Sequence, residues 1–359
     1  MTDASSHQPR QSWALTVSRE DLSRTVLSDR PDPPLDEGQA RLAVRRVGLT
    51  ANNVTYAVLG ESFRYWDFFP ADPGLGIVPL WGFAEVVESR APGVDVGGRY
   101  YGYLPSASHL VVQPGRVDER GFADATPHRA GLPSPYNAYA LTTGDPAYDA
   151  AHEDLLVLFR PLFYTSFMLA DQLQDNGFFG AGALAFSSAS SKTAYSTAHL
   201  LSGVGPRVVG LTSAANVDFT MSLGVYDEVL SYDDVSALDP ALPTAYLDVS
   251  GSPRVASAVR ERLGASLVRE VIIGVTSQQQ SGSKGAALFF APDQMRKRVE
   301  DWGRDGLDRA FAEAWHRFVP AATGWVDVVT SHGPQALERV WLEVLAGRAA
   351  PRTGHIVVL

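Results

Sequence analysis

Between residues 183 and 275, short apolar runs alternate with segments of helical spacing, and this alternation limits the chain to one class of fold. Helical spacing covers 193–201, 216–223 and 252–263. Units of a strand and a helix that repeat every ~25 to 30 residues are typical of a parallel, doubly wound sheet covered on both faces. The predicted strands are 183–186 (ALAF), 207–211 (RVVGL), 228–230 (EVL), 244–249 (TAYLDV) and 270–275 (EVIIGV).

The residues on either side of this region predict a second, β-rich domain. Short strands separated by Gly and Pro turns suggest a small barrel, with strands at 39–47, 83–87, 99–104 and 109–112. Later residues predict a helix near 293–318 broken at Gly303 or Gly306, a strand at 325–329, a helix at 334–345 and a strand at 356–359. We therefore expect domains at 1–158, 159–290 and 291–359, the last returning to complete the first.

Composition excludes several kinds of function. The 359 residues carry a net charge of -10 and contain no cysteine, so we expect no disulfide, no thiolate nucleophile and no nucleic-acid partner. The eight histidines include no i, i+4 pair of the kind that binds a metal. No apolar stretch is long enough to span a membrane. The first ~12 residues resemble a flexible tail rather than a signal peptide, and we expect a cytoplasmic protein.

The turn after the first strand of the α/β region is the strongest candidate for a binding site. Small residues follow the strand, and Lys192 and Thr193 open the next helix. Such a turn directs free backbone N–H groups and the positive end of a helix at one point, which suits a phosphate. A lysine in the first helical turn is disfavoured unless an anion lies nearby. The candidate hydroxyl donors are Ser187, Ser188, Ser190 and Ser191; the alternative is a serine-rich turn without a ligand.

The end of the next strand bears on the choice of nucleotide. Sites for NAD commonly place an acid there to hold the ribose hydroxyl, but here Thr212, Ser213 and Asn216 come before the first acid, Asp218. Neutral side chains tolerate a ribose phosphate and favour NADP(H). These residues can also act as helix caps.

The order of these segments resembles the medium-chain dehydrogenase/reductase superfamily. The resemblance rests on 33–49, on 82–100 (GFAEVVESRAPGVDVGGRY), on 183–224 and on 248–251 (DVSG). It implies an α/β protein with a GroES-like β-barrel catalytic domain and a Rossmann domain that binds NADP(H). It also implies a homodimer.

The chain departs from the superfamily's zinc enzymes. It has no cysteine, and Trp81 stands where a zinc-binding histidine would be expected. We therefore expect no catalytic metal, and the zinc-free quinone and enoyl reductases are the better comparison. In those enzymes the phosphate turn is rich in glycine, whereas this chain has SSASSK.

The resemblance also indicates residues near the nicotinamide. Asn52 or Asn53 is expected beside the ring, and Tyr56 could donate a hydrogen bond or a proton to a carbonyl oxygen. The alternative is that the asparagines hold a turn and that Tyr56 is packed. Further residues expected at the site are Tyr164 and Ser166, Ser250, Val275 and Thr276.

The segment 61–70 (ESFRYWDFFP) is dense in aromatic residues. We expect a hydrophobic lid over an apolar or aromatic substrate. A buried loop or a dimer contact is the alternative. Arg64 could anchor a carboxylate, or be an ordinary surface arginine. The expected substrate pocket consists of Phe63, Tyr65, Trp66 and Trp81.

Together these features predict a zinc-independent, NADP(H)-dependent oxidoreductase. It would reduce a small enone, quinone or ketone by hydride transfer to a carbon of the substrate. One alternative is a redox-silent protein that binds NADPH as a sensor or catalyses a non-redox reaction such as an isomerisation. A second alternative is an interaction protein without a ligand.

Overall fold

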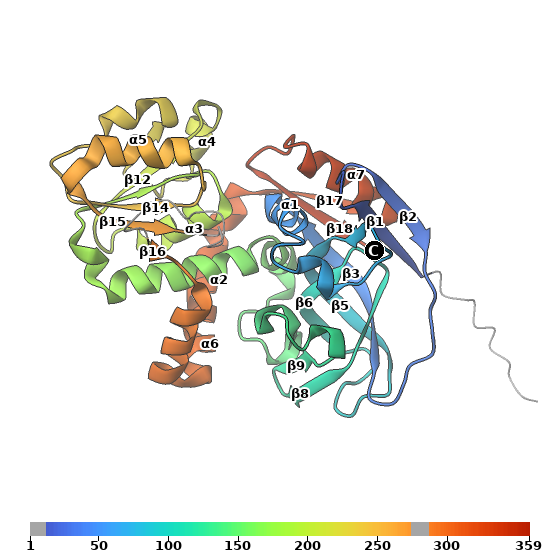
Figure 1. Cartoon of the computed structure of the whole chain (residues 1–359). Helices are drawn as coiled ribbons and strands as arrows, with labels where there is room; N and C mark the ends of the chain where they lie inside the picture. Colours follow the sequence, from blue (N-terminus) through green and yellow to red (C-terminus); the bar gives the residue numbers. More distant parts are fainter. Residues whose placement is uncertain (1–11, 274–286) are drawn as a thin grey trace, which may run out of the picture. The chain divides into compact units, whose positions relative to one another are not determined.

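The computed structural model describes residues 12–273 and 287–359, and these form two compact units. The first unit comprises residues 1–158 and 326–359, and the second comprises residues 159–325. Figure 1 labels their elements. The strands of each unit pair only with strands of the same unit.

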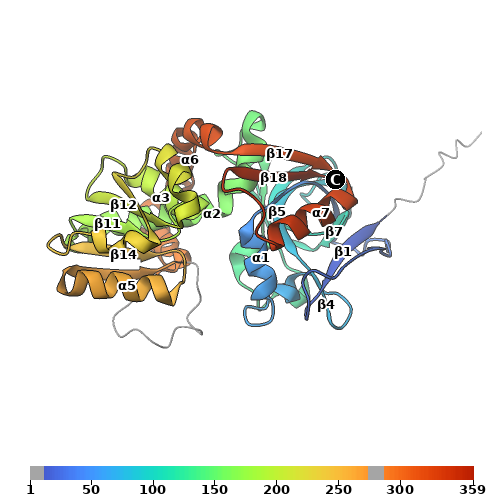
Figure 2. The ribbon, with the colours of Figure 1, turned by 90° about the horizontal axis from the view of Figure 1, so that it is seen from above.

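The second unit is built on a parallel sheet of six strands in the order β13-β12-β11-β14-β15-β16. Numbered within the unit, this is the order 3-2-1-4-5-6 of the Rossmann fold, which reverses between β11 and β14. These two strands lie side by side in Figure 2, with Phe186 opposite Leu247. The strands are β11 (Ala183–Phe186), β12 (Arg207–Thr212), β13 (Glu228–Ser231), β14 (Thr244–Asp248), β15 (Leu267–Ile272) and β16 (Ala287–Leu288).

Helices cover both faces of this sheet. Helix α5 lies on one face and α2 on the other (Figure 1). Apolar side chains of α5 such as Val255 and Val259 pack against Val209 and Tyr246 of the sheet, as expected of strands buried on both sides. The helices of this unit are α3 (Lys192–Leu201), α4 (Val217–Ser222), α5 (Pro253–Leu263), α6 (Ala291–Trp325) and most of α2 (Glu153–Asp175).

The first unit contains a sheet of nine strands and a sheet of three. The larger sheet has the order β17-β18-β3-β5-β6-β10-β9-β8, with β7 also paired to β3, and the smaller has the order β2-β1-β4. The N-terminal strands are β1 (Trp13–Ser18), β2 (Thr25–Asp29), β3 (Ala40–Leu49), β4 (Leu75–Ile77), β5 (Pro79–Ser89), β6 (Arg99–Pro105), β7 (His109–Val112), β8 (Pro114–Asp118), β9 (Gly121–Asp124) and β10 (Ala138–Leu141).

The C-terminal segment completes the larger sheet. Strand β18 (Thr353–Val358) pairs antiparallel with β3, and β17 (Asp327–His332) pairs parallel with β18. The amphipathic helix α7 (Pro334–Leu345) buries Leu337 and Trp341 in the core of this unit, and a short helix, α1 (Ala51–Val58), follows β3. The predicted return of the chain to its first domain is therefore made by residues 326–359.

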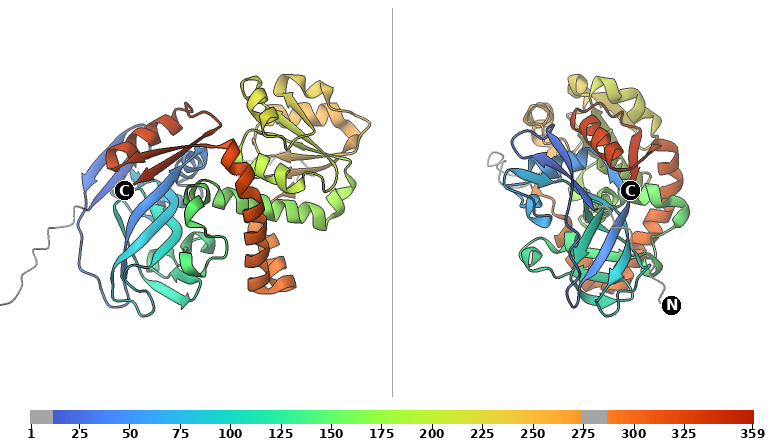
Figure 3. Two further views of the ribbon diagram at one scale, coloured as in Figure 1. Left: turned by 180° about the vertical axis from the view of Figure 1, so that it is seen from behind. Right: turned by 90° about the vertical axis from the view of Figure 1, so that its right-hand side faces the viewer.

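Residues 291–325 differ from the expected division of the chain. We expected 291–359 to return as one piece, but α6 belongs to the second unit. Its Phe311, Trp315 and Phe318 pack around Phe163 of α2, so burial of this aromatic face holds α6 there. The helix breaks at Gly303, which has a φ of 71°, one of the two positions expected. Figure 3 draws α6 in orange to red. Strand β15 begins three residues earlier than predicted, at Leu267.

Candidate functional site

The carboxyl ends of β11 and β14 meet at the reversal point of the Rossmann sheet, and a hydrogen-bonded cluster joins them there. The Ser187 hydroxyl donates to Oδ1 of Asp248 at 2.8 Å and accepts the backbone N–H groups of Val249 and Ser250. Oδ1 of Asp248 also accepts from the Tyr246 hydroxyl, from Ser250 and from the N–H of Gly251. Ser187 and Asp248 are both buried.

We call Ser187, Tyr246, Asp248 and Ser250 the switch-point cluster. Two of its members, Ser187 and Ser250, have other contacts than we predicted. We expected Ser187 to donate to a phosphate and Ser250 to contact the cofactor. Instead, both hydroxyls donate to Asp248, so they fix the loops after β11 and β14. The sequence pattern DVSG marked Asp248, but we did not predict that it organises this point.

The bend that follows is also held from within the unit. Ser188 adopts a left-handed backbone with a φ of 50°, and its N–H donates to the Tyr232 hydroxyl at 2.9 Å. The Tyr226 hydroxyl donates to the carbonyl of Ala189. The Ser191 hydroxyl caps α3 by accepting the N–H of Ala194. We did not predict a role for these two tyrosines. Tyr226 lies in the loop before β13, and Tyr232 is the residue directly after β13.

The amino end of α3 still has capacity to bind an anion. The backbone N–H groups of Ser190, Lys192 and Thr193 donate to none of the described residues, and they lie in the bend and the first turn of the helix. Lys192 forms no ion pair within the described part of the chain. Burial lowers the pKa of its ammonium group to about 8, and Nζ lies 5.7 Å from the centroid of the Phe159 ring. A cation in a desolvated place at the positive end of a helix is stabilised by a bound anion.

The neutral residues after β12 lie beside this bend. The Thr212 hydroxyl and the Asn216 amide both donate to the Ser190 hydroxyl, at 3.3 and 3.2 Å. The Ser213 carbonyl accepts the N–H of Asn216, so Ser213 begins the turn before α4. No acid takes part in this group of four residues, so the place is electrically neutral. Val275 and Thr276, also expected at the cofactor, lie outside the described residues.

Tyr164 and Ser166 of α2 have different surroundings. The Ser166 hydroxyl is within hydrogen-bond distance of the carbonyls of Leu162 and Thr193, so it ties α2 to α3. The Tyr164 ring lies 5.2 Å from that of Phe311 of α6, and burial raises the pKa of its hydroxyl to about 12. In the second unit, therefore, Ser166 has a structural role and Tyr164 faces α6.

In the first unit, Tyr56 of α1 is the centre of a group of polar aromatic side chains. Its hydroxyl accepts from Nδ2 of Asn52 at 2.7 Å and from Nε1 of Trp81 at 3.0 Å. Asn52 reaches it because residues four apart lie on one face of a helix. Burial raises the pKa of Tyr56 well above its usual value, whereas the two N–H donors act to lower it. Trp81, which stands at the sequence position expected of a zinc-binding histidine, thus provides an indole N–H donor to Tyr56.

Asn53 differs from its neighbour and has a structural role. It is buried; its Oδ1 accepts the N–H of Thr50, and its Nδ2 donates to the carbonyl of Pro79. Together with Thr50 it forms a capping box that starts α1. The alternative interpretation, that an asparagine here holds a turn, fits Asn53, whereas Asn52 is directed at Tyr56.

The aromatic segment 61–70 divides between core and surface. Trp66, Phe68 and Phe69 are buried, while Phe63 and Tyr65 are partly exposed. Trp66 packs so closely on two glycines that a Cβ at Gly60 or Gly76 would lie 2.0 or 2.6 Å from its ring. It is therefore a core residue, contrary to its expected place in a substrate pocket. Arg64 is exposed and pairs with Asp67, as an ordinary surface arginine would.

Tyr65 and a residue that we did not predict, Tyr136, complete the group. Tyr136 lies in a short 3-10 helix at Ser134–Asn137, and its hydroxyl is 3.3 Å from that of Tyr65. Its ring contacts the rings of Tyr56, Trp81 and Tyr103. We call Tyr56, Tyr65, Trp81, Tyr103 and Tyr136 the tyrosine cluster. No local pattern marks Tyr136, which is 71 residues from Tyr65.

No three His, Asp or Glu side chains are grouped so that they could hold a metal ion among residues 12–273 and 287–359. No helix within these ranges has the length and apolar character needed to cross a membrane.

Solved structures confirm the fold. CurA from Vibrio vulnificus, in complex with NADPH, has a TM-score of 0.61 at 14% identity, covering 97% of this chain and 98% of that chain. The quinone oxidoreductase from Coxiella burnetii has a TM-score of 0.56 at 13% identity, covering 98% and 100%. The enoyl reductase CurK has a TM-score of 0.56 at 13% identity, covering 97% and 99%. The chain thus has the predicted α/β fold of the medium-chain dehydrogenase/reductase superfamily, with a GroES-like and a Rossmann domain.

A search of the curated proteins gave no match. A family model, in contrast, matches residues 47–350, which span most of both units. The chain therefore belongs to the family described as "Protein of unknown function (DUF2855)".

Proposed function

We propose that this protein is a zinc-independent, NADP(H)-dependent oxidoreductase that reduces a small enone, quinone or ketone. The observation that carries the proposal is Lys192, a desolvated cation without an ion-pair partner among the described residues, at the amino end of α3 and next to the reversal point of a Rossmann sheet. Ligands of such sheets bind at this point. The NADPH bound to CurA, which shares the fold, is consistent with it.

The residues at the bend fit the diphosphate of a dinucleotide. The free N–H groups of Ser190, Lys192 and Thr193 would hold phosphate oxygens, and the Lys192 ammonium would neutralise their charge. The neutral group of Thr212, Ser213 and Asn216 leaves room for a ribose phosphate, which favours NADP(H) over NAD(H). Ser187 and Ser250 would act indirectly, by fixing the two loops.

When bound, the nicotinamide supplies a hydride to the substrate. The protein must then stabilise the negative charge that develops on oxygen and provide a proton. In the first unit, the proton donor in this proposal is Tyr56, whose oxygen already accepts two N–H bonds. The other polar groups of the tyrosine cluster are uncharged hydroxyls and an indole N–H, and these suit a neutral carbonyl compound with an apolar or aromatic body.

One observation favours the second alternative, an interaction protein without a ligand. The hydroxyls of Ser187 and Ser190 are already engaged inside the unit, and the N–H of Ser188 is bound to Tyr232. A bend held in this way offers fewer donors to a phosphate. The homodimer belongs to the proposal on the resemblance alone, and light scattering tests it. A cytoplasmic location is part of the same proposal.

Thermal unfolding with NADPH, with NADH and without nucleotide separates these cases. The proposal expects NADPH to raise the melting temperature more than NADH does, because a ligand of the native state stabilises it. Oxidation of NADPH in the presence of an enone, quinone or ketone supports the reductase. Binding without oxidation over such a panel supports the sensor, and the absence of any shift with either nucleotide contradicts both.

A further inference from the structure

The Tyr56 hydroxyl oxygen accepts two hydrogen bonds, and neither of these two partners can accept the hydroxyl's own proton. It accepts from Asn52 at 2.7 Å and from Trp81 at 3.0 Å. Both partners are N–H donors, so neither can receive the phenol proton. The proton must therefore point away from Asn52 and Trp81. If the proton is lost, these two donors already hydrogen-bond the phenolate oxygen that remains.

Two further phenols continue from this hydroxyl. The Tyr136 ring packs edge-on against that of Tyr56, with centroids 6.2 Å apart, and the Tyr136 hydroxyl lies 3.3 Å from that of Tyr65. The ring of Tyr65 lies 4.7 Å from that of Tyr56 and 5.7 Å from that of Tyr136. Tyr56 is buried, whereas Tyr65 and Tyr136 are partly exposed. The three phenols therefore lie together, and they extend from one buried side chain to two partly exposed ones.

We propose that Tyr136 and Tyr65 form a proton relay that recharges Tyr56 after it has protonated the reduced substrate. The inference rests on the proposed function. The substrate gains a hydride, with its electron pair, from the reduced nicotinamide at carbon. The resulting anion takes the proton of Tyr56 as the O–H bond breaks and leaves its electron pair on the phenol oxygen. Tyr136 then gives its proton to Tyr56, Tyr65 gives its proton to Tyr136, and water gives a proton to Tyr65.

The N–H donors have a definite part in this sequence. A phenolate at Tyr56 would form charge-assisted hydrogen bonds with Asn52 and Trp81, which are stronger than the bonds to a neutral phenol. Asn52 and Trp81 are therefore positioning residues that stabilise the charged intermediate state of Tyr56. Tyr136 and Tyr65 carry the proton.

The first test measures turnover in variants that keep the rings. Tyr136→Phe and Tyr65→Phe each remove a relay hydroxyl, and Tyr100→Phe, at a buried tyrosine outside the cluster, is the matched control. We expect kcat to fall about 10-fold or more in both relay variants, to recover partly with added imidazole, and to leave the Kd for NADPH unchanged. Unchanged kcat in both relay variants would overturn the relay.

The second test needs neither cofactor nor turnover, and so separates failure of the relay from failure of the proposed function. Difluorotyrosine, whose phenol ionises at lower pH, is placed at position 56, and its phenolate absorbance is titrated. Tyr136→Phe and Asn52→Ala each remove a hydrogen-bond donor, so each should raise the pKa of the difluorotyrosine at position 56 by about one unit. Tyr100→Phe should leave this pKa unchanged. An identical titration in the Tyr136→Phe background shows that Tyr136 does not serve Tyr56. If no variant or wild type oxidises NADPH, the proposed function fails whatever the titration gives.

Discussion

The Ser187 hydroxyl donates to Oδ1 of Asp248 across 2.8 Å, which joins β11 to β14 where the strand order of the Rossmann sheet reverses. The same oxygen of Asp248 receives four further hydrogen bonds, from Tyr246, Ser250 and Gly251. A carboxylate that holds so many donors keeps two loops in fixed positions. It also places a negative charge next to the bend that we propose for a diphosphate, which makes the cation of Lys192 more important there.

Ser187→Ala should lower the free energy of unfolding and change the affinity for NADPH little. The variant leaves the N–H group of Val249 without its acceptor in a partly buried place, whereas the N–H of Ser250 keeps Asp248 as an acceptor. The expected cost is about 1–3 kcal/mol in the free energy of unfolding. Urea unfolding measures this cost, and titration with NADPH measures affinity. Ser62→Ala, at an exposed loop position, is the control. A large loss of affinity in a stable Ser187→Ala protein would contradict the structural role.

Lys192→Met should weaken NADPH binding by about 10-fold or more, because it removes a charge-assisted contact to phosphate while retaining the apolar stem. Lys297→Met is the matched control, since Lys297 is a surface lysine that pairs with Asp175. Isothermal titration gives both dissociation constants. Equal affinity in the two variants would remove Lys192 from the site.

The lowered pKa of Lys192 predicts how stability depends on pH. The pKa is about 8 in the folded protein and 10.5 as its ordinary value, so the unfolded chain binds this proton more strongly. Through this group, the free energy of unfolding should rise between about pH 8 and about pH 10.5. Comparing wild type with Lys192→Met across that window isolates the effect. A difference that does not change with pH would show that the ammonium is not desolvated.

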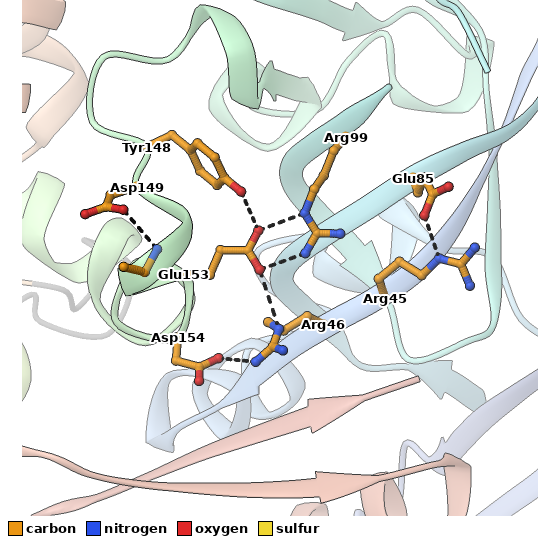
Figure 4. A network of polar contacts seen from close by, with 9 residues as sticks. Arg45, Arg46, Glu85, Arg99, Tyr148, Asp149, Glu153 and Asp154 are labelled. Carbon is orange, nitrogen blue, oxygen red and sulfur yellow. Dashed lines mark hydrogen bonds and ion pairs between the residues drawn. The ribbon is translucent and has the colours of Figure 1, made fainter. Parts of the chain in front are cut away.

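Glu153→Gln should destabilise the first unit at neutral pH. Glu153 starts α2 and receives two hydrogen bonds of 2.8 Å from Arg99 and one from Tyr148, with Arg46 also close (Figure 4). Burial alone would raise the pKa of Glu153, but the bonds from Arg99 and Tyr148 bring it below its usual value. The stabilisation is therefore present above the usual pKa of a glutamate and is lost as pH falls through the lowered value.

The expected cost of Glu153→Gln is about 1–2 kcal/mol at pH 7, with the difference from wild type shrinking in acid. Glu85→Gln is the control. Glu85 pairs with Arg45 at 3.2 Å where both side chains are partly exposed, and it appears in the same view (Figure 4). Such a pair contributes about 0–1 kcal/mol. Equal losses in the two variants would mean that burial does not strengthen the Glu153 contacts.

Trp66→Leu and Phe63→Leu distinguish core from surface in the aromatic segment. Trp66 is 3% exposed and packs against two glycines, so the smaller side chain leaves a cavity and should cost about 2–4 kcal/mol. Phe63 is partly exposed and should cost less than 1 kcal/mol. Thermal unfolding of both variants checks the order. The opposite order would place Trp66 outside the core.

The period of apolar residues was enough to predict the classes and many of the bounds of the elements. Strand β7 at 109–112 and helix α7 at 334–345 were predicted where they occur, and the break at Gly303 is one of the two positions predicted for it. These features depend on the local spacing of apolar residues and on the positions of glycines, and both can be read directly from the sequence. The order of motifs likewise predicted the two kinds of domain. Strands β1 and β2 were not predicted.

The partners within the two clusters depended on tertiary structure. Ser187 and Asp248 are 61 residues apart, and Tyr65 and Tyr136 are 71 residues apart. Their hydrogen bonds arise where the reversal in strand order and the folding of the barrel bring separate loops together. Alternation of apolar and polar residues contains no information about which loops will meet. For that reason the sequence indicated Ser187 as a phosphate ligand and Trp66 as a pocket residue, whereas packing made the first a link between strands and buried the second in the core.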